Sequence, residues 1–220
     1  MMENEIELVF DYPANLADRL LNNEIVIGLV PVAVLPAMQE YHIVADYCIG
    51  CKGEVASVCL FSNVPLYEIE TILLDYQSRT SVALLKILLK DHWKISPRLL
   101  AAEKGFEKNI GGTTAGLVIG DRAFAQRLTS AYHYDLGLAW QQMTGLPFVF
   151  AAWISNKKMT AAFSETFNKA TALGLHQLDT IAALNPYTDF NLPEYYKKNI
   201  SYVFDEDKKK ALQKFLQLLG

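Results

Sequence analysis

Hydrophobic positions along the chain alternate between strand-like runs and helix-like spacing. Apolar runs predict strands at residues 26–32, 42–47, 56–61, 72–74, 117–119 and 148–153. Apolar residues recur at helical spacing over residues 15–21, 80–93, 135–143, 164–173 and 205–219. Because the two types alternate, we predict an α/β fold. A further strand at residues 6–10 would complete a compact β-α-β unit with a parallel sheet.

The chain has no Gly/Ser-rich linker and no internal repeat, so a domain boundary would pass through strands. Two long apolar segments, residues 55–62 and 148–155, stand symmetrically about a middle section. If both cross between lobes, residues 1–62 and 150–220 form one lobe and residues 63–149 form the other. A cleft between two lobes is a favoured site for a small ligand.

One segment, from Leu73 to Leu85, brings hydroxyls and an arginine to a predicted helix start. Its candidate ligand contacts are Ser78, Arg79, Thr80 and Ser81. Free backbone N–H groups and the helix dipole favour a carboxylate or phosphate there. The planar guanidinium of Arg79 suits a carboxylate. The alternative is an ordinary helix cap, with Arg79 paired to a surface acid.

Other polar positions are weaker candidates. Asp121 ends a buried strand, where it either lines a cleft or caps the next turn. The C-x-x-C pair Cys48 and Cys51 is expected in a turn between strands, because Gly50, Lys52 and Gly53 surround it; redox or zinc chemistry is disfavoured there. The four histidines have no metal-ligand spacing. We therefore expect no metal site.

Composition narrows the function further. The chain has 220 residues, 51% of them hydrophobic, and a formal net charge of −4. No basic run is interleaved with aromatic residues, so we expect no nucleic-acid partner. No apolar run reaches the roughly 18 residues of a membrane span, and the first residues lack the basic start of a secretion signal. We expect a cytoplasmic protein with a small-molecule partner, its oligomeric state left open.

Several segments in register resemble the chorismate dehydratase family of the futalosine route to menaquinone. They are Val26-Ile27-Gly28-Leu29-Val30-Pro31-Val32-Ala33, Asp46-Tyr47-Cys48-Ile49 with Ser57-Val58, Asp75-Tyr76-Gln77-Ser78-Arg79-Thr80-Ser81, Ile119-Gly120-Asp121, Tyr134-Asp135-Leu136, Trp140, and Thr144-Gly145-Leu146-Pro147-Phe148-Val149-Phe150-Ala151-Ala152-Trp153. The resemblance implies a fold like type II periplasmic binding proteins, with two α/β lobes, two crossover strands and an interdomain cleft.

The resemblance also implies a reaction, the removal of water from chorismate to give 3-[(1-carboxyvinyl)oxy]benzoate without a cofactor. The residues at 78–81 are the natural donors to one substrate carboxylate, and Ser57 could serve the other side. Thr144 and Gly145 would add a hydroxyl and a backbone N–H. The catalytic base is unidentified, and one hypothesis assigns the role to the substrate's own enolpyruvyl carboxylate.

One departure concerns the first residues. Family members usually begin with a strand and an Asn-containing segment that lines the active site, whereas this chain opens at about the second strand. We therefore expect little dehydratase activity from the chain as given, and more from an extended one. The alternatives are the related 1,4-dihydroxy-6-naphthoate synthase and a non-catalytic protein that binds a small carboxylate.

Overall fold

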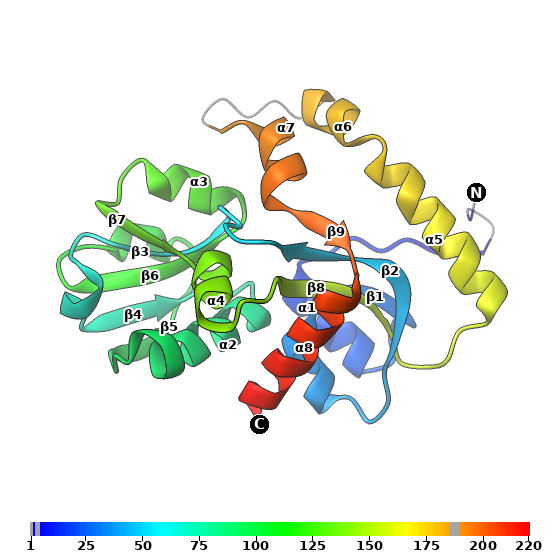
Figure 1. Cartoon of the computed structure of the whole chain (residues 1–220), viewed down its shortest axis with the longest axis horizontal. Coiled ribbons are helices and arrows are strands. Elements are labelled where there is room, and N and C mark those ends of the chain that lie inside the picture. Colours follow the sequence, from blue (N-terminus) through cyan, green and yellow to red (C-terminus); the bar gives the residue numbers. More distant parts are fainter. Residues whose placement is uncertain (1, 3–4, 185–189) are drawn as a thin grey trace.

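The computed structural model describes residue 2 and residues 5–184 and 190–220, and shows two β-sheets side by side with helices around them (Figure 1). The helices are α1 (Pro13–Leu21), α2 (Arg79–Ile87), α3 (Asp121–Arg127), α4 (Leu136–Thr144), α5 (Ala161–Leu175), α6 (Leu178–Leu184), α7 (Leu192–Glu194) and α8 (Glu206–Leu219). π-Helical turns extend α2 over Leu88–Trp93 and α7 over Tyr195–Asn199. The α/β class predicted from the alternating pattern is confirmed.

The first sheet is antiparallel throughout and has the order β1-β8-β2-β9. Its strands are β1 (Ile27–Pro31), β8 (Phe148–Ser155), β2 (His42–Cys51) and β9 (Ser201–Val203). The strand β8 is almost entirely buried, which explains its unbroken apolar sequence. The sheet therefore joins segments that are far apart along the chain.

The second sheet is mixed and has the order β5-β4-β6-β3-β7. Its strands are β3 (Val58–Ser62), β4 (Thr71–Leu74), β5 (Arg98–Ala101), β6 (Thr114–Ile119) and β7 (Tyr132–Asp135). Both neighbours of β4 are parallel to it, whereas β3 runs antiparallel to β6 and β7. As a result β3 begins, and the other four strands end, at the same edge of the sheet.

The predicted β-α-β unit at residues 6–32 is wrong. Residues 6–10 belong to no strand within the described part of the chain, and Leu8 and Phe10 are 66% and 89% exposed. The helix at 13–21 forms as expected, but β1 pairs with β8 in antiparallel register. Local hydrophobicity indicated a strand at residues 6–10. The strand that pairs with β1 is instead β8, which comes more than a hundred residues later in the chain.

The predicted turn at the C-x-x-C pair is also misplaced. Cys48 and Cys51 lie in the last residues of β2, and the turn follows them. Both thiols are buried and free. The strand therefore continues through Gly50, although the glycines in this segment had indicated a turn.

One hydrophobic core extends under both sheets. It includes Val30 and Phe148 of the first sheet, Leu60 of the second, and Trp140 and Phe215 from α4 and α8. Helix α2 packs against both α4 and α8, so it contacts elements associated with each sheet. This continuity fixes the start of α2 relative to both halves of the molecule.

Candidate functional site

Three of the predicted segments meet at one edge of the five-stranded sheet. Ser57 precedes β3, the segment from Asp75 to Ser81 follows β4, and Asp121 follows β6. The carbonyl of Ser57 accepts a hydrogen bond from the N–H of Gly120 at 2.8 Å. The topology thus brings together residues that are more than sixty positions apart.

The start of α2 is built as a capped helix. Ser78 is the N-cap, and its hydroxyl accepts from the N–H of Ser81 at 3.1 Å and lies 2.8 Å from the Ser81 hydroxyl. The buried Thr80 hydroxyl accepts from the N–H of Ala33, after β1, at 3.2 Å. The N–H groups of Arg79 and Thr80 lie in the first turn, where a helix supplies no backbone acceptor. This end of α2 is suited to an anion.

Arg79 forms an ion pair with Asp18 of α1 at 2.6 Å. The two side chains are 40% and 54% exposed. The pairing with a surface acid that was the alternative interpretation is therefore present in the structure. A substrate carboxylate at Arg79 would have to displace Asp18, and its role in binding stays a prediction.

Ser57 shares a hydrogen bond with Tyr195, whose phenol oxygen lies 2.7 Å from the serine hydroxyl. Burial raises the pKa of Tyr195 to about 12, so the phenol keeps its proton at neutral pH. The ring of Tyr195 packs edge-on against the ring of Phe124, with 5.2 Å between the ring centres. The ring of Phe190 stacks on that of Phe124, with 3.8 Å between the centres. Nothing in the sequence near residue 195 indicated this contact.

Asp121, predicted to end a strand and then line a cleft or cap the next turn, is the first residue of α3, whose N-cap is Gly120; a role in lining a cleft stays a prediction. Asp135 is the N-cap of α4, and Thr144 and Gly145 lie at the opposite, C-terminal end of this helix. The two ends are roughly 13 Å apart along the helix axis. The hydroxyl of Thr144 donates to the carbonyl of Trp140 at 2.8 Å. Gly145 has φ +73°, the left-handed conformation that commonly ends a helix. Their positions serve the local helix end, and any contact with a ligand stays a prediction.

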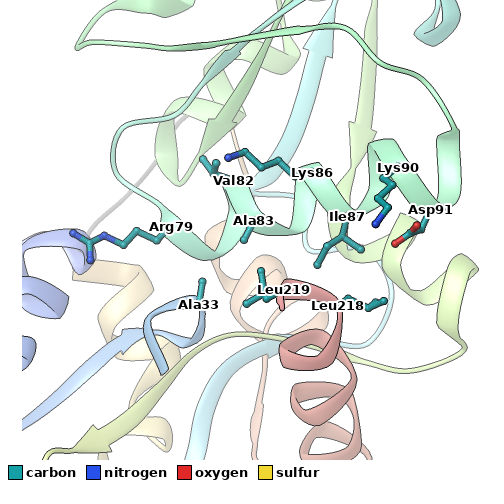
Figure 2. Close-up of a pocket in the computed structure, with 10 residues that line it drawn as sticks. All are labelled: Ala33, Arg79, Val82, Ala83, Lys86, Ile87, Lys90, Asp91, Leu218 and Leu219. Carbon is teal, nitrogen blue, oxygen red and sulfur yellow. The ribbon is translucent and has the colours of Figure 1, made fainter. Parts of the chain in front are cut away.

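Two neighbouring hollows lie along α8, and the first, shown in Figure 2, also runs along α2 from its start at Arg79. The first has a volume of about 510 Å³ and lies between α2 with its π-helical extension and the C-terminal end of α8. The second, of about 450 Å³, shares Asp91 and Leu218 with it. Arg79 lines the first and Thr144 the second. Ser57, Ser78, Thr80 and Ser81 line neither.

A buried ion pair next to the site was missed by the sequence analysis. Asp75 and Arg122 are joined at 2.7 Å, and the Asp75 side chain is fully buried. A "D-Y-Q-S" run before a helix was visible in the sequence, but the arginine that pairs with its aspartate comes 47 residues later. Burial raises the pKa of Asp75, against the opposing effects of its hydrogen bonds to Gln77 and Arg122.

Neither a metal site nor a membrane span is found in the described residues. No three His, Cys, Asp or Glu side chains among them are grouped as metal ligands would be. No helix in the same residues is both long enough and apolar enough to cross a bilayer. The cytoplasmic location stays a prediction.

The fold places the protein in the class of two-lobed α/β proteins that resemble periplasmic binding proteins. A crystal structure of a protein from Archaeoglobus fulgidus is similar with a TM-score of 0.69, at 16% identity, covering 97% of this chain and 85% of that one. An ABC transporter protein from Parabacteroides distasonis matches with a TM-score of 0.62, at 15% identity, over 96% and 80% of the two chains. The alkanesulfonate-binding protein of Xanthomonas axonopodis pv. citri, bound to MOPS, matches at 0.52, with 11% identity, over 94% and 78%.

The chain belongs to the menaquinone biosynthesis family, whose sequence profile matches residues 1–220. The chorismate dehydratase of Thermus thermophilus is 29% identical to this chain over an alignment of 235 positions. The alignment covers 94% of this chain and 84% of that protein. The predicted family resemblance and the predicted fold class are therefore both confirmed.

Proposed function

We propose that this protein dehydrates chorismate to 3-[(1-carboxyvinyl)oxy]benzoate in menaquinone biosynthesis. The observation that carries the proposal is the family membership, with a chorismate dehydratase that matches nearly the whole chain. The capped start of α2, with two N–H groups in its first turn and three hydroxyls around it, is consistent with a dicarboxylate ligand. The catalysed step would be a lyase reaction.

The chemistry requires orientation more than a strong catalytic group. A ring proton leaves beside the ether, the neighbouring hydroxyl departs as water after taking up a proton, and the ring becomes aromatic. We assign one substrate carboxylate to the start of α2 and assign the proton acceptor to the substrate's own enolpyruvyl carboxylate. The Ser57–Tyr195 hydroxyl pair, with its protonated phenol, could donate a hydrogen bond on the other side. Catalysis would come from positioning and electrostatic stabilisation.

We also propose that residues 1–62 with 150–220, and residues 63–149, form two lobes that close on the ligand. The two sheets support a division of this kind with shifted boundaries, since β2 and β8 (from Phe148) belong to one sheet, and β3 (from Val58) and β7 belong to the other. The connections after Cys51 and before Phe148 would then act as hinges. Small-angle scattering with and without chorismate tests closure, because bending should give a more compact particle. An unchanged profile at saturating ligand would indicate a rigid site.

The deciding experiment follows chorismate consumption by the purified chain and by a form extended at its N-terminus, with chromatographic identification of the product. Formation of the enolpyruvyl benzoate supports the proposal. A Thr80→Val variant, which keeps the side-chain shape but loses the hydroxyl, should have a raised KM for chorismate. Chorismate binding by calorimetry without turnover would instead favour a carboxylate-binding protein, and turnover of a naphthoate precursor would favour the related synthase.

A further inference from the structure

We propose that Asp75 and Arg122 are positioning residues for the proposed reaction, which hold the loop before α2 in register with the Ser57 and Asp121 segments. The inference rests on the proposed function, which assigns the start of α2 to substrate binding. Neither side chain is proposed to touch the substrate. Both would act through the loop that carries Ser78.

Asp75 joins the ends of two parallel strands. One carboxylate oxygen accepts from the N–H of Gln77 at 2.8 Å, which closes a tight turn just before the helix cap. The other oxygen accepts from the N–H of Ile119, the last residue of β6, at 3.2 Å. The next residue, Gly120, donates to the carbonyl of Ser57 at 2.8 Å. A continuous chain of hydrogen bonds thus links the loop before α2 to Ser57.

Arg122 holds three consecutive loop residues with one guanidinium group. One of its nitrogens donates to Asp75 at 2.7 Å and to the side-chain carbonyl of Gln77 at 2.8 Å. Its guanidinium carbon lies 5.1 Å from the centre of the Tyr76 ring. Its other terminal nitrogen donates to Glu107 at 2.7 Å. Only a planar fork with several donors makes these contacts at once, so lysine is not an equivalent replacement.

This arrangement affects catalysis because of where the loop leads. The residue after Gln77 is Ser78, the cap of α2, so a shift of the loop moves the cap and the N–H groups of the first turn. A misplacement of about 1 Å in a positioning group can lower a rate by about a hundredfold. The proposed reaction depends mainly on orientation, so this loss would appear in activity before it appears in folding.

The test compares four proteins: the wild type, Arg122→Gln, Arg122→Lys and Phe167→Leu. Phe167 packs in a separate cluster with Met2, Val44 and Ala45, so its variant provides a control for lost stability alone. Both Arg122 variants should have kcat/KM for chorismate lowered by up to about a hundredfold. Arg122→Lys should recover little, because it keeps the charge and loses the fork. Phe167→Leu should lose thermal stability and keep kcat/KM.

Amide hydrogen exchange over residues 76–81 gives a readout that does not depend on turnover. Exchange there should be faster in Arg122→Gln than in Phe167→Leu at matched stability. If the wild type dehydrates chorismate and the Arg122 variants retain the activity of Phe167→Leu, the inference is wrong. If neither the wild-type chain nor a form extended at its N-terminus turns chorismate over, the proposed function is wrong, and unchanged exchange in Arg122→Gln would then overturn the positioning role separately.

Discussion

Replacing Asp135 by alanine should be unusually destabilising for a single truncation. This carboxylate caps α4 by accepting from the N–H of Leu138 at 3.0 Å, and it also accepts from the N–H groups of Val55 at 3.1 Å and Ala56 at 2.7 Å. The side chain is 4% exposed, so water does not readily replace it. Ala56 has φ +65°, a conformation that alanine rarely adopts. The carboxylate therefore holds the strained crossing between the sheets.

The expected loss follows from the three donors. Each buried N–H group left without its hydrogen-bond partner costs about 1–3 kcal/mol, so Asp135→Ala should lower the free energy of unfolding by at least about 3 kcal/mol. Asp205 supplies a matched control, because it also caps a helix but accepts from one backbone N–H, that of Lys208. Its side chain is 34% exposed. Asp205→Ala should cost about 1 kcal/mol.

Urea unfolding monitored by circular dichroism measures both losses. An intermediate loss is expected for Asp135→Asn, which keeps one acceptor oxygen and places an amide donor among the N–H groups. If Asp135→Ala costs no more than Asp205→Ala, the bonds to Val55 and Ala56 do not stabilise the fold, and the reasoning fails.

Three further predictions concern charge and burial. Arg79→Ala should weaken chorismate binding by roughly 1.5–3 kcal/mol in calorimetric titration, with little change in the thermal melt; unchanged affinity would remove Arg79 from the site. Burial lowers the pKa of Lys208 below its ordinary 10.5, so the unfolded chain binds more protons at this side chain and the contribution of Lys208 to stability should rise as pH increases toward 10.5. Lys208→Met should lack that rise in urea unfolding at a series of pH values. Burial raises the pKa of Cys48 to about 11 and also raises that of Cys51 and Cys59, so a thiol reagent at neutral pH should react with these cysteines only after denaturation; rapid reaction of the native protein would contradict this.

Much of the fold could be predicted because it depends on local pattern. The strands β1, β2, β3, β4, β6 and β8 and the helices α1, α2, α4, α5 and α8 all overlap the predicted ranges. The short strands β5, β7 and β9 were not anticipated, because three or four residues carry little periodicity and are defined by the partner that they pair with. The strand predicted at residues 6–10 is absent because a strand also needs a partner. The apolar pattern of these residues was adequate, but no strand in the described part of the chain pairs with them.

The same difference between local and distant contacts decides which parts of the candidate site could be predicted. The cap at Ser78 and the hydroxyls of the first turn follow from residues within four positions of one another. The contacts Ser57–Tyr195 and Asp75–Arg122 join residues 138 and 47 positions apart. No spacing rule relates such pairs, because the three-dimensional route of the chain decides which residues meet. A single sequence therefore indicated the kind of site and not its supporting contacts.

The position of β8 has a consequence for the order in which the molecule can be assembled during translation. All strands of the five-stranded sheet lie within residues 58–135, so that sheet needs no strand from residue 148 onward in order to pair. The strands β1 and β2 are not neighbours, since β8 lies between them. Both must therefore wait, with their edges unpaired, for a segment made about a hundred residues later. A released chain that ended before residue 148 could complete one sheet and would leave two strands open to aggregation or chaperone binding.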